Sequence, residues 1–258
     1  MLISLSIRRI DACAPGRYSQ TCRHDRARRS GDNRGSGVVH DYIEFFRQFR
    51  SRFETTGAIA PSSRFLASAL TRPLGRRTAP ARILEIGPGT GAVTKRIVRL
   101  LGPDDRLDLV ELNERFAEIL ARRYGGAPQH GAPREAVQIH VCPLQEFEPQ
   151  GTYDFIVSGL PLNNFSADLV GEIFETCFRL LSPGGVLSYF EYMYVRPVRK
   201  LVAGERDKTR LTRIDAIMNS YLSEHRIRRD WVFVNLPPAW VQHLQSQSRT
   251  SDFIQPAQ

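Results

Sequence analysis

From residue 81 onward, short apolar runs alternate with segments whose apolar positions recur every three or four residues. The short runs predict strands, and the helical spacing predicts helices between them. We expect strands at 82–86, 106–110, 137–141, 155–158 and 186–190 and helices at 92–101, 113–124, 167–181 and 208–223. Strands at 227–234 and 240–244 follow each other without a helix, which is typical of an antiparallel pair. The chain is therefore expected to form an α/β fold, mostly parallel, with helices on both faces.

A stripe of aromatic residues precedes this region. Residues 40–54 are expected to form a helix whose aromatic positions fall on one face, bordered by arginines. A membrane-interface helix has this pattern, because guanidinium groups extend toward the phosphates. A helix packed across the core of its own domain has the same pattern, so both interpretations stay open. The residues proposed for membrane or substrate contact are Tyr42, Phe45, Phe46, Phe49, Arg50, Arg52 and Phe53.

The first residues of the chain show no periodicity. Residues 1–39 contain eight arginines against three aspartates, a large part of the net charge of +9. This composition predicts a disordered basic arm at 1–36. A short helix at 64–71 and a Pro- and Gly-containing linker at 71–80 come next. We therefore expect three units: the arm at 1–36, a helical extension and linker at 37–80, and a main domain at 81–250.

Composition limits the cellular setting that we expect. No run of 18 apolar residues exists, and the apolar N-terminus is too short for a signal peptide. The four cysteines have no spacing typical of a zinc site, so we expect no metal. These features favour a cytoplasmic protein. The basic balance suits nucleic acid or an anionic membrane surface equally well.

The stretch with the clearest chemistry is the glycine turn after the first strand. Gly87, Gly89 and Gly91 allow backbone to approach a ligand where a Cβ would collide. Glu111 ends the next strand, where a carboxylate can accept both ribose hydroxyls of a nucleoside. The same glycines fit a dinucleotide pattern. Glu85 favours a ligand that carries an ammonium group over one that carries a pyrophosphate.

Three segments together resemble class I S-adenosylmethionine-dependent methyltransferases: Glu85-Ile-Gly-Pro-Gly-Thr-Gly91, Glu111-Leu-Asn113 and Leu181-Ser-Pro-Gly-Gly185. The resemblance implies S-adenosylmethionine as cofactor and a Rossmann-like seven-stranded sheet with an antiparallel last strand. It also implies that the glycine turn faces the methionine part, that Glu111 holds the ribose and that the loop at 143–145 borders the adenine. The implied cofactor-binding residues are Glu85, Gly87, Pro88, Gly89, Thr90, Gly91, Glu111, Leu112, Leu144, Gln145, Ser158 and Gly159.

Four further segments resemble bacterial phospholipid N-methyltransferases that associate with membranes: Thr56-Gly-Ala-Ile-Ala-Pro-Ser-Ser63, Ser158-Gly-Leu-Pro-Leu-Asn-Asn-Phe165, Tyr189-Phe-Glu-Tyr192 and Asn235-Leu-Pro-Pro238. This resemblance implies methylation of a lipid amine, in phosphatidylethanolamine or an ornithine lipid. It also implies an anionic membrane surface as partner and a peripheral location at the inner leaflet.

The expected reaction is in-line attack of an amine on a sulfonium methyl group. The amine becomes cationic, so catalysis depends on positioning and on stabilising positive charge. Ser158 and Asn163, after the fourth strand, are expected to orient the amine. Glu191 and Tyr192, at the end of the fifth strand, are expected to accept its proton or stabilise the ammonium. Glu191 is alternatively an exposed carboxylate at a strand end.

Two other functions compete with lipid methylation. An rRNA adenine N6-methyltransferase usually has Asn/Asp-x-Pro-aromatic after the fourth strand, where the aromatic ring stacks on a flipped base. Here the run is Ser158-Gly-Leu-Pro-Leu162, and Phe165 lies three residues late for stacking, so nucleic acid is not the expected partner. A membrane-binding module that keeps the fold without activity is disfavoured by the intact glycine turn and Glu111.

Overall fold

The computed structural model describes residues 64–125, 136–193, 204–235 and 237–247. The predicted arm at 1–36 and the predicted aromatic helix at 40–54 lie outside these residues. The membrane-contact candidates Tyr42, Phe45, Phe46, Phe49, Arg50, Arg52 and Phe53 therefore stay predictions.

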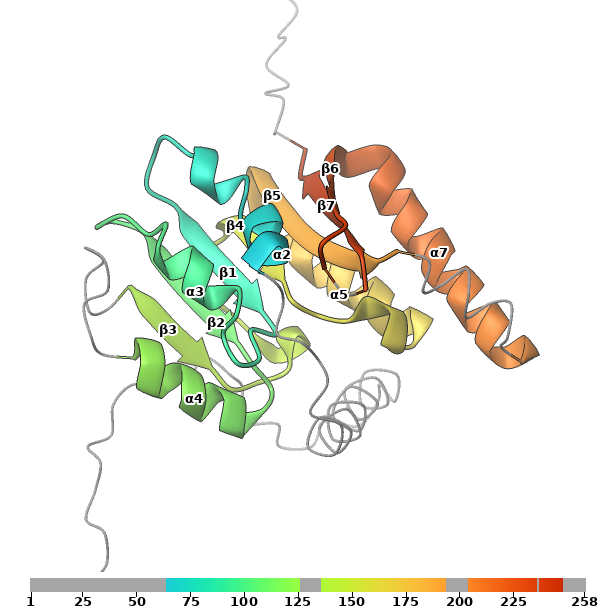
Figure 1. Cartoon of the computed structure of the whole chain (residues 1–258), viewed down its shortest axis with the longest axis horizontal. Coiled ribbons are helices and arrows are strands. Elements are labelled where there is room, and N and C mark those ends of the chain that lie inside the picture. The colour runs from blue at the N-terminus through green and yellow to red at the C-terminus, as the bar shows by residue number, and fades with distance from the viewer. Residues whose placement is uncertain (1–63, 126–135, 194–203, 236, 248–258) are drawn as a thin grey trace, which may run out of the picture.

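A seven-stranded sheet forms the centre of the described molecule, in the order β3-β2-β1-β4-β5-β7-β6 (Figure 1). The first five strands are parallel, whereas β7 pairs antiparallel with both β5 and β6. This arrangement confirms the predicted sheet, including the antiparallel last strand. The strands are β1 (Arg82–Ile86), β2 (Arg106–Val110), β3 (Val137–His140), β4 (Tyr153–Ser158), β5 (Leu181–Tyr192), β6 (Arg226–Val232) and β7 (Ala239–Gln245).

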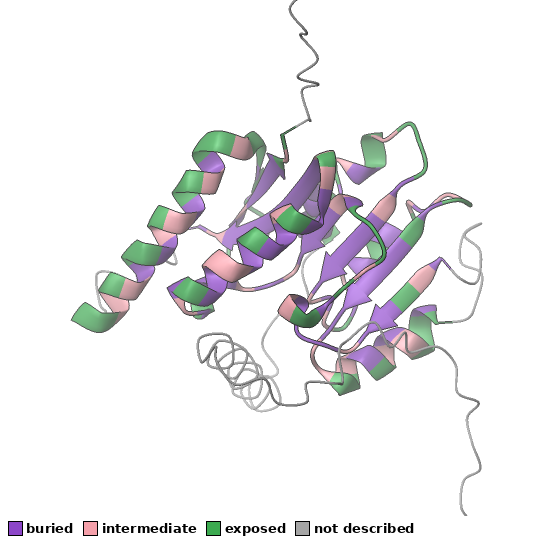
Figure 2. Cartoon of the chain, turned by 180° about the vertical axis from the view of Figure 1, so that it is seen from behind, coloured by how far each residue is buried: buried purple, intermediate pink, exposed green. Residues whose placement is uncertain are grey.

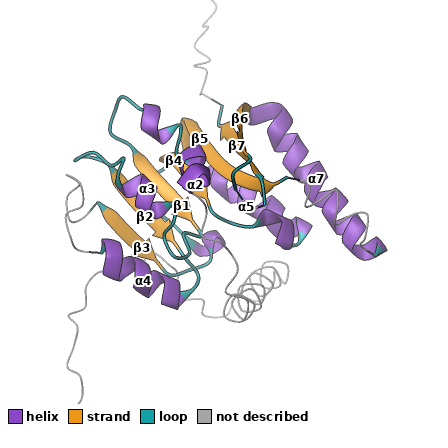
Figure 3. Cartoon of the chain, viewed as in Figure 1, coloured by secondary structure: helices purple, strands orange, loops and turns teal. Residues whose placement is uncertain are grey.

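Helices cover both faces of the sheet and divide the core into two (Figure 3). One core packs under α5 and α7, and the other under α2, α3 and α4. Buried residues follow the strands and the inward sides of the helices (Figure 2). The helices are α2 (Arg64–Leu70), α3 (Thr94–Val98), α4 (Glu114–Tyr124), α5 (Ala167–Leu180) and α7 (Glu205–His225), with 3₁₀ turns η1 (Leu74–Arg76), η2 (Leu144–Glu146) and η3 (Leu162–Asn164).

Several boundaries differ from the prediction. Helix α3 covers only Thr94–Val98, because residues 92 and 93 still belong to the glycine turn. Strand β5 begins at Leu181, where it pairs with Tyr153, and the register shifts before regular pairing resumes at Val186. Residues 182–185 lie between these two pairings and form the irregular start of β5, which the expected strand at 186–190 leaves out. Helix α2 contributes Leu66 and Leu70 to the core, and the domain limit at residue 80 stays a prediction.

A buried polar network holds the antiparallel end of the sheet. His243 on β7 lies 2.8 Å from the Ser188 hydroxyl on β5 and 3.3 Å from Asp230 on β6. Asp230 also pairs with Arg72, just after α2, at 2.7 Å, and with Arg228. Burial lowers the pKa of His243, so the ring is neutral and one ring nitrogen accepts from Ser188. The network therefore ties three strands to the segment after α2.

Candidate active site

The glycine turn leaves the carboxyl end of β1 in a left-handed backbone conformation. The φ angles of Gly87, Gly89 and Gly91 are +64°, +56° and +85°. The Gly87 amide donates to the Val110 carbonyl of β2 at 2.9 Å, which anchors the turn between the two strands. Only glycine adopts such angles without strain, so the sequence pattern reflects real backbone geometry.

The three glycines meet different surroundings. A Cβ on Gly87 would lie 2.5 Å from Leu160, and one on Gly91 would lie 3.0 Å from Leu120 and 3.2 Å from Tyr124. A Cβ on Gly89 would meet no atom within 4 Å. Gly87 and Gly91 are therefore required by packing inside the protein. Gly89 alone faces open space, which is where a ligand can approach the turn.

The last residues of helix α4 contact the backbone of the glycine turn. The Arg123 guanidinium donates to the Thr90 carbonyl at 2.8 Å, and the Tyr124 hydroxyl reaches the Gly91 carbonyl at 3.4 Å. Thr90 itself is exposed, whereas Pro88 is buried. These contacts involve backbone carbonyls of the turn, so no motif in the sequence indicated them.

Glu111 is fixed beside the turn at the end of β2. One carboxylate oxygen accepts from the Gly89 amide and the other from the Asn113 amide, both at 2.9 Å. Asn113 in turn caps α4 by accepting from two backbone amides. Only 1% of Glu111 is exposed, and this burial raises its pKa. The carboxylate oxygens keep lone pairs that could accept from ribose hydroxyls, and the ribose role of Glu111 stays a prediction.

Glu85 lies near the carboxyl end of β1, one residue before Ile86, and is also only 1% exposed. Burial raises the pKa of Glu85 to about 8. The Thr94 hydroxyl and amide lower this pKa, and the charge of Glu111 raises it by a smaller amount. Its Oε2 and the Thr94 hydroxyl have no partner of normal hydrogen-bond geometry among the described residues. An ammonium group would satisfy this buried oxygen, so the site fits the amino-acid end of S-adenosylmethionine.

The loop expected to border the adenine gives a mixed result. Leu144 starts η2 and is fully buried in the core under α5, so its side chain presents no surface to a ligand. Core packing occupies this side chain, and the role of Leu144 in cofactor binding stays a prediction. Leu112 is half-buried beside the same core. Both polar atoms of the Gln145 amide are buried, and the amide lies close enough to Glu172 to lower the pKa of that carboxyl.

The loop after β4 packs directly against the glycine turn. The Gly159 amide donates to the Ile86 carbonyl at 2.8 Å, and a Cβ on Gly159 would lie 2.7 Å from the Gly87 carbonyl. Ser158 is 2% exposed and pairs in register with Ile86 and with Tyr189. The structure therefore places Ser158 and Gly159 beside the turn, and their roles in binding the cofactor and orienting the amine stay predictions.

The rest of this loop is held by α7. The Arg210 guanidinium donates to the carbonyls of Asn163 and Phe165, at 3.2 and 2.6 Å. Asn163 is 7% exposed. Phe165 is 2% exposed and lies in the core, so the idea that it stacks on a base is wrong for this structure. Sequence analysis missed Arg210, since its partners are carbonyls far away in the chain.

Glu191 and Tyr192 end β5 on opposite faces of the sheet, because side chains alternate along a strand. Glu191 is 3% exposed and accepts from the Gln242 amide of β7 at 3.1 Å. Its interpretation as an exposed strand-end carboxylate is therefore wrong. Tyr192 packs edge-on against Phe190 with ring centroids 5.2 Å apart. The structure thus brings Glu191 onto the same face as Ser158 and puts Tyr192 on the other.

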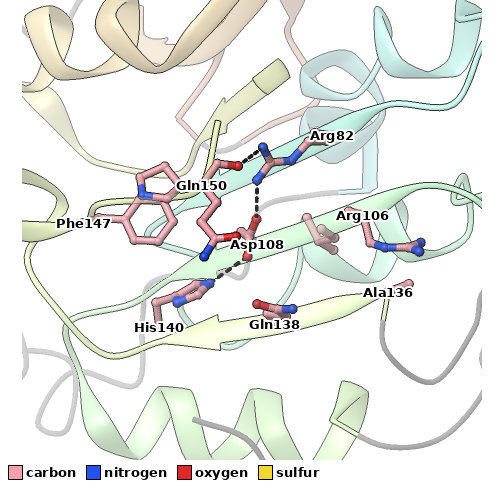
Figure 4. A pocket seen from close by; sticks show the side chains of 10 residues that line it. Arg82, Arg106, Asp108, Ala136, Gln138, His140, Phe147 and Gln150 are labelled. Atoms are coloured by element: carbon pink, nitrogen blue, oxygen red, sulfur yellow. Dashed lines mark hydrogen bonds and ion pairs between the residues drawn. The ribbon is translucent and has the colours of Figure 1, made fainter. Parts of the chain in front are cut away.

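A separate cavity of about 350 Å³ lies over the opposite part of β1, β2 and β3 (Figure 4). Asp108 forms its polar floor and is held by His140 at 2.7 Å and by the Tyr153 hydroxyl at 2.8 Å. Arg82 lies 3.9 Å from the same carboxylate. This carboxylate has its hydrogen-bonding needs met within the protein, and none of the predicted site residues lines the cavity.

No group of three or more His, Cys, Asp or Glu side chains suited to a metal ion occurs within residues 64–125, 136–193, 204–235 and 237–247. The candidate site in this part of the chain consists of the glycine turn, two buried carboxylates and the loop after β4.

Comparisons with known proteins agree with this site. Residues 84–187 match the family model described as a methyltransferase domain. An ornithine lipid N-methyltransferase from Singulisphaera acidiphila is 29% identical over 159 residues, covering 60% of this chain and 80% of that protein. A compactin diketide synthase from Penicillium citrinum is 32% identical over 147 residues, or 56% of this chain, but the chain spans only 6% of that protein's length.

Solved structures share the fold. The N-methyltransferase NodS from Bradyrhizobium japonicum, solved with S-adenosyl-L-homocysteine, aligns with a TM-score of 0.53 at 16% identity. That alignment covers 80% of this chain and 98% of NodS. At this identity the likeness concerns the fold alone.

The sheet order, the glycine turn with Glu85 and Glu111, and the matched domain define a class I methyltransferase. The chain is an S-adenosylmethionine-dependent methyltransferase that resembles lipid N-methyltransferases.

Replacing Gly89 tests where the cofactor meets the turn. Gly89→Ala is expected to weaken S-adenosyl-L-homocysteine binding about tenfold or more, because the new methyl enters the ligand's space, while the left-handed backbone costs only about 1 kcal/mol of stability. Gly87→Ala is the matched comparison and should lose more stability, because its methyl would collide with Leu160. Calorimetric binding and thermal unfolding measure both effects. Wild-type affinity in Gly89→Ala would show that the cofactor does not approach there.

Glu85→Gln should stabilise the free protein and weaken cofactor binding. The pKa of Glu85 in the folded protein, about 8, exceeds its ordinary value of 4.5. The neutral carboxyl therefore contributes fully to the stability of the folded protein below pH 4.5, and this contribution is lost as the pH rises toward 8. The amide stays neutral, so at pH 7 the variant should gain about 3 kcal/mol of stability. It cannot pair with an ammonium group, so affinity should fall.

The measurements are thermal unfolding between pH 5 and pH 8 and binding of S-adenosyl-L-homocysteine. The stability difference between Glu85→Gln and wild type should grow with pH over this window, as the sign of the pKa shift requires. The exposed Glu114→Gln is the control and should change neither quantity. Equal affinities of wild type and Glu85→Gln would contradict the assignment of Glu85 to the ammonium group.

Proposed function

We propose that this methyltransferase transfers a methyl group to the amine headgroup of a membrane lipid, either phosphatidylethanolamine or an ornithine lipid. The observation that carries the proposal is the match to an ornithine lipid N-methyltransferase, which extends over 80% of that protein. The polyketide synthase relative, by contrast, matches over only 6% of its length. A match along most of a single-function relative supports a shared substrate class better than a match to one part of a large assembly.

One set of residues is proposed to bind the methyl donor. When bound, S-adenosylmethionine supplies a methyl group on a positively charged sulfur. Glu111 would hold the ribose and Glu85 the ammonium group of the methionine part, so the cofactor would be fixed on both sides of its sulfonium. The turn at Gly89 gives the cofactor a close approach to backbone. These residues position the methyl donor and leave the acceptor amine to the other side of the site.

The acceptor amine is oriented by the loop after β4 and by β5. Ser158 and Gly159 lie beside the glycine turn. Further along the same loop, the Arg210 guanidinium holds the Asn163 carbonyl. Glu191 lies on the same face, and its carboxylate is oriented by Gln242. As the amine attacks, it becomes an ammonium, and an oriented buried carboxylate stabilises that charge or accepts the released proton. Tyr192 lies on the other face, so we propose it as a wall of the site and not as the base.

Methylation of an RNA base is the disfavoured alternative. At the first position of the loop after β4, where such enzymes have Asn or Asp, this chain has Ser158, and Phe165 is buried in the core. The described residues therefore offer no ring at the position where a flipped base would stack.

We also propose that the protein acts at the cytoplasmic side of a membrane, through the aromatic stripe at 40–54. Among the described residues, no helix is long and apolar enough to cross a bilayer. Aromatic rings with bordering arginines suit the interface between acyl chains and anionic headgroups.

Methyl transfer from labelled S-adenosylmethionine separates the two substrate classes. Label is expected in amine lipid presented in vesicles and not in RNA. Glu111→Ala should lose most of this activity because the cofactor loses its ribose acceptor, while Glu114→Ala, an exposed carboxylate nearby, should keep it. Label in RNA alone would contradict the lipid proposal.

The aromatic stripe has its own test. Phe45→Ala combined with Phe49→Ala should weaken binding to anionic vesicles about tenfold or more, because two large apolar side chains leave the interface. Co-sedimentation with vesicles measures the affinity. Phe65→Ala, which removes an exposed ring from α2, is the control and should bind like wild type. Unchanged binding by the double variant would contradict the proposal for the stripe.

A further inference from the structure

The edge strand β6 ends in an exposed apolar patch. Trp231 is 53% exposed, Phe233 64% and Val234 67%. We call these three residues the rim patch. The rings of Trp231 and Phe233 stack with centroids 5.6 Å apart, so they form one continuous surface. Large apolar side chains gathered at one exposed place usually mark a contact with another molecule.

The rim patch lies at the same end of the sheet as the candidate site, where the parallel strands have their carboxyl ends. Val232 at the end of β6 pairs with Ala239, and Ala239 pairs with Tyr192 at the end of β5. Strand β6 therefore runs parallel to β5, and its carboxyl end lies at the same edge as the carboxyl ends of β1 and β4 (Figure 1). The glycine turn and the loop after β4 leave the sheet at that edge. Phe233 and Val234 follow β6 directly there.

One row of side chains connects the rim patch to the acceptor side of the site. Glu191 on β5, Trp240 on β7 and Trp231 on β6 are register partners, so they lie side by side on one face of the sheet. Trp240 meets Trp231 edge-on, with centroids 5.8 Å apart. The neighbouring Gln242 donates to Glu191. The surface thus changes from an exposed indole to a buried carboxylate across three strands.

The charge and size of the rim patch favour a lipid bilayer as the occupant. The exposed Arg229 guanidinium lies over the Trp240 ring at 5.4 Å, so a cation borders the aromatic row, in a chain with a net charge of +9. Three side chains expose far less than the about 800 Å² that each partner buries in a standard protein interface. Indole and phenyl rings beside an arginine suit the headgroup region of an anionic membrane.

We propose that the rim patch inserts into the headgroup region of an anionic bilayer and turns the acceptor side of the site toward the lipid amines. This is a membrane contact in the β6–β7 turn, separate from the aromatic stripe at 40–54. It rests on the proposed lipid-amine substrate for its purpose, but the contact itself is measured without any substrate.

The test compares two variants of the full chain. Phe233→Ser combined with Val234→Ser removes apolar surface from the turn, and Ile227→Ser removes an equally exposed side chain from the other end of β6. Both changes are on exposed side chains, so both proteins should fold, as thermal unfolding will verify. Co-sedimentation uses vesicles of equimolar phosphatidylcholine and phosphatidylglycerol, which contain no amine acceptor. The double variant should bind about tenfold more weakly than wild type, and Ile227→Ser should bind like wild type.

Activity measurements separate this proposal from the lipid-methylation proposal. Methyl transfer to phosphatidylethanolamine in anionic vesicles should fall in the double variant in proportion to its lost binding. Transfer to a water-soluble, short-chain form of the same lipid should match wild type, because the site itself is unchanged. If wild type methylates neither lipid while the vesicle affinities still differ as expected, the lipid substrate is wrong and the rim patch stands.

Two results would overturn the proposal. One is equal vesicle affinity for wild type and the Phe233→Ser, Val234→Ser double variant. The other is self-association of wild type that the double variant loses while vesicle binding stays the same, since the patch would then bind a second copy of the chain. Sedimentation velocity without vesicles measures that self-association.

Discussion

The close contact between two backbone segments, the glycine turn after β1 and the loop after β4, is the constraint on which the site depends. Gly159 donates to the Ile86 carbonyl, and its missing side chain leaves only 2.7 Å between a would-be Cβ and the Gly87 carbonyl. Any other residue at position 159 would push the two segments apart. In the proposed reaction, one segment receives the methyl donor and the other faces the acceptor, so this contact would set the distance over which the methyl group moves.

Two buried carboxylates show a conflict between stability and binding. Glu85 and Glu111 are each 1% exposed, and burial raises both pKa values. Glu111 is partly compensated by two backbone amides, whereas Glu85 keeps one buried oxygen without a partner among the described residues. A group that is unsatisfied in the free protein and fits a cationic ligand gains most when the ligand arrives. The free protein is thus less stable than it would be with neutral side chains here.

The antiparallel end of the sheet has a different role. The buried His243 network joins β5, β7 and β6 to Arg72, so this end is rigid on the α2 side. On the other face, Glu191, Trp240 and Trp231 form the row that leads from a buried carboxylate to an exposed ring. This part of the sheet presents apolar side chains beside the site, which suits it to fixing the orientation of the enzyme on a membrane. In the proposed arrangement, the reaction and the membrane contact lie at the same end of the sheet.

The sequence by itself determined the strand-turn-helix unit around the glycines and the positions of Glu85 and Glu111. It also indicated which strands pair parallel and which antiparallel. These follow from local rules: alternation of apolar residues, the φ angles that glycine allows, and the position of an acid at a strand end. The turn at 87–91 and the antiparallel last strand were both predicted correctly. Boundaries failed where pairing between distant strands decided, as at Leu181, which pairs with Tyr153.

Only the tertiary structure decided which candidate side chains face the site. Leu144 and Phe165 are buried because they pack in the core under α5. Glu191 is buried beside β7, where Trp240 is its register partner and Gln242 donates to its carboxylate. Arg210 holds the loop after β4 from a helix more than forty positions later, through carbonyls that every residue has. Burial and such backbone contacts depend on segments that meet only in the folded chain. Local residue patterns carry no record of them, and the sequence could name the chemistry but not the direction of each side chain.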